Sequence, residues 1–289
     1  MKQLFSVLLA LCLLLSVLPA QAQVYVKQDP PEDWQQRDLL RITVFRTGEG
    51  DCMLLEAGGE CMMIDGGPYK YREKLRDALQ DRGITHFKYL FSTHPHDDHI
   101  KGLEMLMTYG FEVEEFLSVF PKDVKDTEGN QKDAMKALDK AGIPYRQLND
   151  GDVLTLGGAE LTVFFWAEGF SMNAQSGAAK LIFGDCSALF TADITGDTQK
   201  YFLETLGAEF LKADVVKTPH HGITPMVGDF LTAVDPGYIW CTNYHGDRVE
   251  KTQNQATYRK IPIQFSGDGT IVMECDGTDW YINQTLYEF

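Results

Sequence analysis

Thr93-His94-Pro95-His96-Asp97-Asp98-His99 is the most informative stretch of this sequence, because it crowds three imidazoles and at least one carboxylate into seven positions. An apolar, β-rich run at residues 86–93 leads directly into it. Imidazole nitrogen together with carboxylate oxygen suits zinc, and also manganese or iron. So many titratable groups would be hard to pack in one loop without a cation, so a solvated polar loop is the weaker interpretation. The H-x-H-x-D-H spacing lets alternate side chains face one ion and the adjacent Asp-His pair face a second.

The pattern around this stretch alternates strands and helices over one continuous span. We expect strands over residues 40–45, 51–56, 61–65, 86–93, 153–156, 160–166, 178–183, 187–191, 213–217 and 238–241. We expect helices over residues 69–82, 100–109, 132–141, 199–206 and 226–234. This order indicates an α/β (α+β) chain with two sheets flanked by helices, rather than two separate domains.

Three further motifs stand in a fixed order around the central stretch. Met63-Ile64-Asp65-Gly66-Gly67 precedes it, and Leu189-Phe190-Thr191-Ala192-Asp193 and Val216-Lys217-Thr218-Pro219-His220-His221-Gly222 follow it. From about residue 40 to the C-terminus, the set resembles the metallo-β-lactamase superfamily. That resemblance implies a four-layer αββα sandwich of two mixed β-sheets flanked by helices, and a metal-dependent hydrolase.

The residues of these motifs are most similar to those of the hydrolase domain of ComEC-type competence proteins. Gly50-Asp51-Cys52-Met53-Leu54-Leu55 would match the opening hairpin, Pro219-His220-His221-Gly222 the late histidines, and Asn243-Tyr244-His245-Gly246 a segment near the end. Secreted phosphorylcholine esterases share the architecture. ComEC-type domains are normally tethered to a multi-span channel that this chain lacks, so a role in DNA uptake does not carry over securely.

The resemblance also implies which residues bind the ions. His94 and His96 would hold the first metal, Asp98 and His99 the second, and Asp193 would bridge the two. One of His220 or His221 would complete the second site; we favour His221 as ligand and His220 as a substrate-facing or supporting group. Zn²⁺ is the expected cofactor, with Mn²⁺ as the alternative, as one or two ions.

Supporting roles are assigned to residues near these ligands. Asp65 resembles the family's buried aspartate that orients ligands, although Asp-Gly is also a common turn pair. Lys217 is expected either to face a phosphate or to be a solvated residue at a strand end. His245 is a candidate for contact with substrate or for catalysis, alongside Asp98, Asp65 and His220.

The sequence departs from the family pattern in one respect. Between Ile100 and Pro219 there is no histidine, so the third histidine that many members give to the first metal is missing. Asn173, assigned here to substrate binding, and Gln175 lie where it would have been. An amide oxygen is a weaker zinc ligand than imidazole, so we predict unequal occupancy of the two sites. Two full equivalents of tightly held metal would reject this prediction.

The ends and the composition of the chain indicate export. Residues 1–22 have the charged start, short apolar centre and small-x-small ending of a secretory signal, with cleavage expected after Ala22. The apolar run is shorter than the roughly 20 residues needed to span a bilayer, so an uncleaved anchor is disfavoured. Residues 23–38 look like a linker or an edge segment, and residues 39–289 form the hydrolase domain. We therefore expect a secreted or extracytoplasmic protein without a membrane span.

The charge and the cysteines limit the partners. The net charge is −16, and such a surface repels nucleic acid, so no extended nucleic-acid groove is expected. Five of the six cysteines remain after cleavage, an odd number, so at least one is free or paired between molecules. Export would permit a disulfide without requiring one.

A metal pair would lower the pKa of a shared water toward about 7 and so supply hydroxide for hydrolysis. We favour a phosphodiester in a small or short substrate: a nucleotide, a short single strand or a phosphorylated wall component. The alternatives are a hydrolase of carbon esters, lactones or lactams, and a catalytically silent binding module on the same fold.

Overall fold

The computed structural model describes residues 22–286 and 288–289. The predicted signal peptide lies outside the described residues except for its last position, Ala22. None of the helices in the described part of the chain combines the length and the apolar composition that a membrane-spanning helix requires.

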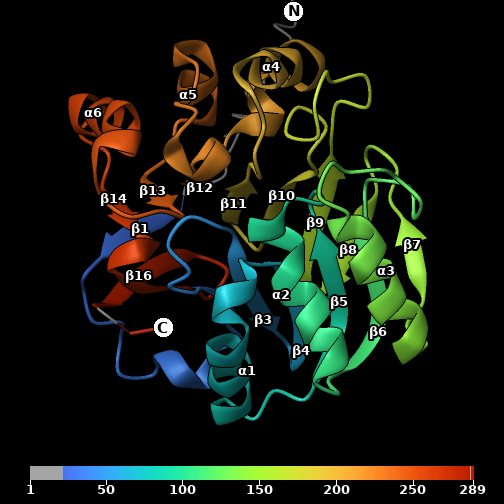
Figure 1. Cartoon of the computed structure of the whole chain (residues 1–289). Coiled ribbons are helices and arrows are strands. Elements are labelled where there is room, and N and C mark those ends of the chain that lie inside the picture. Colours follow the sequence, from blue (N-terminus) through green and yellow to red (C-terminus); the bar gives the residue numbers. More distant parts are fainter. Residues whose placement is uncertain (1–21, 287) are drawn as a thin grey trace, which may run out of the picture.

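Two mixed sheets face each other, with helices on both outer faces (Figure 1). In spatial order the first sheet contains β1 (Gln23–Val26), β16 (Asp279–Leu286), β15 (Gly269–Cys275), β2 (Leu40–Val44), β3 (Cys52–Ala57), β4 (Glu60–Gly66), β5 (His86–Ser92), β6 (Glu112–Ser118) and β7 (Tyr145–Gln147). The second contains β14 (Ile263–Phe265), β13 (Tyr238–Cys241), β12 (Val215–Lys217), β11 (Cys186–Phe190), β10 (Ala178–Phe183), β9 (Ala159–Phe164) and β8 (Val153–Leu156). The expected four-layer αββα sandwich is confirmed.

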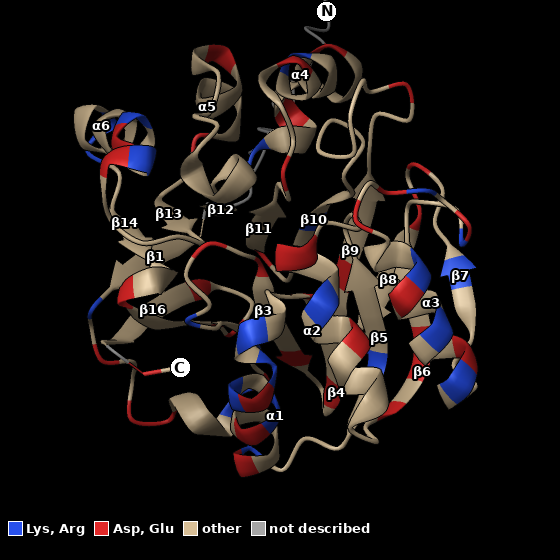
Figure 2. Cartoon of the chain, viewed as in Figure 1, with Lys and Arg blue, Asp and Glu red and all other residues tan. Residues whose placement is uncertain are grey.

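The helices divide between the two outer faces. The first sheet carries α1 (Arg72–Asp81), α2 (Asp97–Thr108) and α3 (Asn130–Ala141), and the second carries α4 (Gly196–Leu211), α5 (Gly228–Val234) and α6 (Glu250–Arg259). On α1, α2 and α3 acidic and basic side chains are interspersed along the same helices (Figure 2). The strands β6, β7 and β14 to β16 and the helix α6 were not among the elements expected from the sequence.

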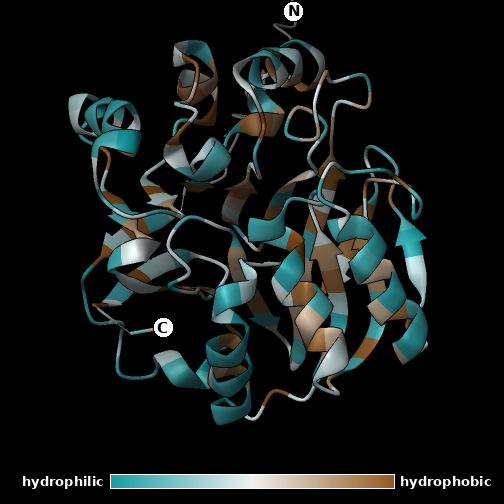
Figure 3. Cartoon of the chain, in the orientation of Figure 1, coloured by the Kyte–Doolittle hydropathy of each residue, from teal (hydrophilic) through white to brown (hydrophobic). Residues whose placement is uncertain are grey.

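Alternating side chains place each strand between two apolar layers. On β4, Met62 and Ile64 point into the core between the sheets, whereas Met63 packs under the helices. On β13, Trp240 likewise points between the sheets and Ile239 toward the helices. Both faces of these strands are therefore apolar, and the brown strands of Figure 3 lie inside the largely teal outer helices.

The segment at residues 23–38 belongs to the fold and is not a linker. β1 pairs in parallel with β16, and it forms the edge of the first sheet. Trp34 is buried, and its indole N–H donates to Glu274 at 3.1 Å. Of the two alternatives, the edge segment is therefore observed, and the sheet begins at Gln23 rather than near Leu39.

Two glycines seat α2 directly on the first sheet. A Cβ on Gly102 of α2 would lie 1.8 Å from the Gly66 carbonyl oxygen, and a Cβ on Gly66 would lie 2.3 Å from the Leu103 nitrogen. Backbone therefore packs against backbone at this point, which only glycine permits. This contact holds the first turn of α2, with Asp98 and His99, at the end of β4.

A disulfide joins the two sheets. Cys186 of β11 is bonded to Cys275 of β15, and both sulfurs lie in the core between the sheets. Cys52, Cys61 and Cys241 are free. The prediction of at least one unpaired cysteine is confirmed within the described residues.

Candidate metal centre

The candidate site lies at one end of the sandwich, where strands of both sheets stop. β5 leads into the loop with His94 and His96, and β4 ends with Asp65 and Gly66. From the second sheet, Asp193 follows β11, and the histidines of η3 (Pro219–Gly222) follow β12. Ligand sites of α/β sheets lie beyond the carboxyl ends of their strands, so the topology gathers these side chains where a site is expected.

One cluster forms around the Nε2 atoms of His99 and His221, which lie 3.1 Å apart. Asp193 Oδ1 is 3.4 Å from each of these nitrogens. Asp98 Oδ2 is 3.1 Å from His221 Nε2, and Asp98 Oδ1 is 3.8 Å from His99 Nε2. These four side chains could hold one ion, and they include every residue that the sequence assigned to the second site.

The opposite edges of the two imidazoles are held by other carboxylates. His99 Nδ1 lies 2.7 Å from Asp65 Oδ2, and Asp65 also accepts hydrogen bonds from the backbone and hydroxyl of Thr93, at 2.9 and 2.6 Å. His221 Nδ1 lies 3.2 Å from Asp51 Oδ1. An imidazole that binds an ion through one nitrogen usually donates its other N–H to such a group. Asp65 and Asp51 therefore orient the histidines from behind.

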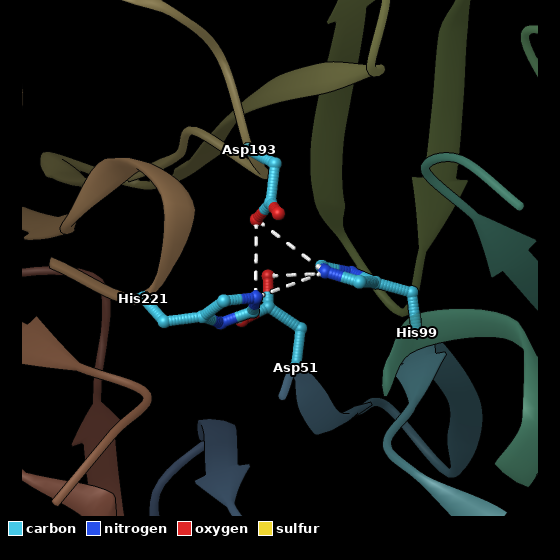
Figure 4. Close-up of side chains that lie close together, drawn as sticks. All are labelled: Asp51, His99, Asp193 and His221. Carbon is cyan, nitrogen blue, oxygen red and sulfur yellow. Dashed lines mark hydrogen bonds and ion pairs between the residues drawn. The ribbon is translucent and has the colours of Figure 1, made fainter. Parts of the chain in front are cut away.

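Asp51 is the residue that sequence analysis missed. It lies close to His99, Asp193 and His221, and all four are buried (Figure 4). Because Asp51 faces Nδ1 of His221 and Asp193 faces Nε2, one ion bound at Nε2 would not contact both carboxylates. We therefore group Asp51 with the orienting residues rather than with the ligands. In the sequence, only the position of Asp51 in the Gly50-Asp51-Cys52-Met53-Leu54-Leu55 motif indicates that it belongs to the site.

Lys217 has neither of the roles expected from the sequence. Its side chain is fully buried, so it neither faces a phosphate in solvent nor is solvated. Its Nζ lies 2.9 Å from Asp51 Oδ2 and donates to the carbonyls of Ala192 and Thr218, at 2.8 and 3.0 Å. Lys217 thus connects Asp51, which supports His221, to the backbone that leads into Asp193.

A second cluster forms on the other oxygen of Asp193. His94 Nε2 lies 3.0 Å from His96 Nδ1 and 3.7 Å from Asp193 Oδ2. His94, His96 and Asp193 are close enough to hold an ion together. This is the predicted first site, and Asp193 lies between the two clusters with one oxygen toward each.

The remaining candidates divide between the site and its surroundings. His220 lies near the first cluster, and Asn173 Nδ2 is 3.4 Å from His220 Nε2. Gln175 instead bonds the carbonyls of Ala167 and Gly169 within its own loop. His245 is exposed and packs edge-on against Phe265; no contact with the metal-binding clusters is recorded for it among the described residues.

Unfavourable backbone conformations concentrate here. Asp65, Ala192, His220 and His221 all have positive φ, between 45° and 54°, a region that non-glycine residues rarely adopt. Such strain persists only where surrounding contacts enforce it, and it is typical of functional sites.

The pKa values reflect crowding and burial. Burial and the neighbouring His99 lower the pKa of His94 well below its usual range. In His99 and His221 burial also disfavours the charge, but Asp193 and the other carboxylates outweigh it, so both pKa values are raised. The pKa of Asp193 is lowered despite its burial, because His221 and His99 face it. The carboxylates around these two imidazoles favour their protonated forms, so a bound ion would compete with protons at this position.

The donor set fits divalent ions. Two ligands about 2.05 Å from one tetrahedral zinc ion lie about 3.3 Å apart, close to the 3.1–3.8 Å of the second cluster and the 3.0–3.7 Å of the first. Asp193 Oδ1 is buried and has no hydrogen-bond partner, as expected of an oxygen meant for a cation. Nitrogen and carboxylate oxygen suit zinc, manganese and iron alike.

Comparison with known proteins places this site in a family. The sequence profile of the Metallo-beta-lactamase superfamily matches residues 46–239, about two thirds of the chain and most of the site. The chain belongs to the metallo-β-lactamase superfamily. It has the His/Asp metal site of a metal-dependent hydrolase of this fold. The match does not distinguish the ComEC-type branch, so that part of the resemblance stays a prediction. No curated protein matches the sequence.

Solved structures share the fold at low identity. The metallo-beta-lactamase fold protein YhfI from Bacillus subtilis has a TM-score of 0.51 and 14% identity, covering 79% of this chain and 96% of its own. Igni18, a metallo hydrolase from Ignicoccus hospitalis, has a TM-score of 0.50 and 17% identity, covering 78% and 94%. CmlA, a diiron beta-hydroxylase from Streptomyces venezuelae, has a TM-score of 0.51 and 14% identity, covering 82% of this chain. The present chain spans about half the length of CmlA, 53%.

Proposed function

We propose that this metal-dependent hydrolase cleaves a phosphodiester bond in a small or short phosphorylated substrate, with Zn²⁺ or Mn²⁺ as cofactor. The observation that carries the proposal is the position of Asp193, whose two oxygens each face a separate histidine cluster at 3.4–3.7 Å. Paired divalent ions supply a low-pKa water and clamp both the attacking and the leaving oxygen of an in-line displacement. Phosphodiester hydrolysis is a reaction that uses both effects.

The chain's own residues would perform three tasks. His99 and His221 would bind the second ion from the closed side, where both imidazoles are almost completely buried, and Asp98 would bind it from the open side. Asp65 and Asp51 hold those rings in place, so the ligand nitrogens need not reorganise during the reaction. On the open side, the side chain of His220 is 34% exposed and that of Asp98 is 24% exposed, so substrate would approach between them.

The charge of the chain favours a small substrate. A net charge of −16 repels a long polyanion except where local cations reverse the field. The motif resemblance to ComEC-type domains and to phosphorylcholine esterases supports the same substrate class. A nucleotide, a short single strand or a phosphorylated wall component fits both arguments.

The test is turnover of bis-(p-nitrophenyl) phosphate by protein loaded with Zn²⁺ or Mn²⁺. We expect activity in the wild type, loss in Asp98→Ala and His99→Ala, and no change in His86→Ala, a half-exposed histidine at the start of β5. Cleavage of lactones or lactams without any phosphodiester turnover would contradict the proposal in favour of the carbon-ester alternative. A metal-loaded protein inactive on both classes would favour the binding module.

We further propose that the protein acts outside the cytoplasm. The secretory pattern of residues 1–22 and the Cys186–Cys275 disulfide support this, because disulfides persist in oxidising compartments. Fractionation of cells expressing the full chain, with a version lacking residues 2–22 as control, tests the proposal. Retention of the full chain in the cytoplasm would contradict it.

A further inference from the structure

His220 and His221 are consecutive, yet their imidazoles lie on opposite sides of Asp193. His221 Nε2 is 3.4 Å from Asp193 Oδ1, and His220 Nε2 is 3.7 Å from Asp193 Oδ2. Both residues have left-handed backbone angles, with φ of 47° and 53°. Two such residues in succession are costly outside glycine, so the surrounding contacts must favour this divergent arrangement.

We propose that His220 supplies the third nitrogen of the first metal site, together with His94 and His96. The distance from His220 Nε2 to Asp193 Oδ2 equals the 3.7 Å from His94 Nε2 to the same oxygen. Both separations are compatible with two ligands of one ion. His220 lies outside the group of His94, His96 and Asp193 whose ligand atoms are all within 4.8 Å of one another, so its imidazole would move toward that group when an ion binds. The first metal would then have three imidazoles and one carboxylate oxygen.

The other ring nitrogen of His220 supports this assignment. His220 Nδ1 lies 3.2 Å from the hydroxyl of Thr224, which can accept its N–H. That hydrogen bond leaves the lone pair on Nε2, the nitrogen directed toward Asp193. Metal-binding histidines are typically fixed in this way by a hydrogen bond from their second nitrogen.

Asn173 lies beside His220, with its amide nitrogen toward the imidazole. Its Oδ1 is buried and has no hydrogen-bond partner, while its Nδ2 lies 3.4 Å from His220 Nε2. The amide therefore borders the first site without having to replace the absent histidine.

This inference changes the expected metal content. The lack of a histidine between Ile100 and Pro219 predicted a weak first site, whereas a ligand from η3 gives both sites the same number of protein ligands. Wild-type protein is then expected to bind two equivalents of metal ion tightly. The inference concerns ion binding only, so it stands or falls independently of the bond that the enzyme cleaves.

The experiment is a titration of metal-free protein with Zn²⁺ and with Co²⁺, followed by calorimetry and by the visible Co²⁺ spectrum. We expect His220→Ala to keep one tight equivalent and to bind the other at least about 100-fold more weakly, since even outer-shell losses cost 10–100-fold. His86→Ala, which changes an exposed histidine at the start of β5, is the matched control and should bind like the wild type.

A second variant separates ligand loss from backbone damage. His220→Asn retains a residue that tolerates left-handed φ, so its circular dichroism should match the wild type while one site is weakened. Two unchanged affinities in His220→Ala would overturn the proposal. Equal weakening of both sites in folded His220→Asn would also overturn it, because His220 would then act on the loop rather than on one ion.

Discussion

The buried pair of Asp51 and Lys217 offers the sharpest test of how the site is held. Both side chains are fully buried, and Asp51 Oδ2 lies 2.9 Å from Lys217 Nζ. Burial alone would raise the pKa of Asp51, but Lys217 and His221 overcome it and hold the pKa below the usual range. The Asp51 carboxylate therefore depends on Lys217 and His221 to remain ionised in the interior.

The size of the effect follows from the geometry. At 2.9 Å and an effective dielectric constant of about 20, the attraction is about 6 kcal/mol before the cost of burial is subtracted. Removing one partner of such a pair typically costs about 3–5 kcal/mol, because the other charge stays buried without compensation. We expect this loss of unfolding free energy in Lys217→Met and in Asp51→Asn. The double variant should lose at least about 2 kcal/mol less than the sum of the single losses.

Urea unfolding of the metal-free protein, followed by circular dichroism, measures these differences without a contribution from bound ions. An exposed pair, Lys122 and Asp139 at 2.6 Å, provides the control cycle with Lys122→Met and Asp139→Asn. Its coupling should stay below about 1 kcal/mol. Additive losses at Asp51 and Lys217, within about 0.5 kcal/mol, would refute the idea that the two charges compensate each other.

Three further perturbations have expected outcomes. Replacing Cys186 and Cys275 together by alanine opens a loop with a sequence separation of 89 and should lower the unfolding free energy by about 4–5 kcal/mol in urea; an unchanged midpoint would contradict this. Gly102→Ala places a Cβ 1.8 Å from the Gly66 carbonyl, so it should cost about 3 kcal/mol and weaken metal binding through α2, unlike Gly228→Ala, where the space is open. Metal affinity should fall as pH decreases below the raised pKa values of His99 and His221, by up to about tenfold per pH unit for each proton displaced. Calorimetry in buffers of different pH measures this dependence, and an affinity that does not change with pH would contradict it.

Much of the fold and the centre of the site could be predicted because their signals are local. The strands β8, β10 and β13 have the expected bounds, since short apolar runs between glycine turns define them directly. His94, His96, Asp98 and His99 lie within six positions of one loop and helix start, so their proximity needs no knowledge of distant packing. Asp193 could be placed because it follows a recognisable strand.

Only the tertiary structure determines the contacts between distant segments. Asp51 and Lys217 are 166 positions apart, and nothing in either motif shows that β3 and β12 bring them together. The edge strand β1 depends on β16 at the far end of the chain, and β1 begins a largely polar segment, residues 23–38, which the sequence alone leaves open as a linker. Long-range pairing of this kind leaves no local pattern.

The two late histidines, His220 and His221, show most clearly what the sequence determines and what only the tertiary structure determines. Their adjacency in the sequence indicates a metal or substrate role, but adjacent residues on regular backbone could not be assigned to opposite oxygens of one carboxylate. The assignment depends on left-handed φ at two non-glycine positions, which local propensity disfavours and which packing around η3 enforces. The sequence therefore determines which chemical groups gather at the site, and the strained backbone determines which group faces which oxygen.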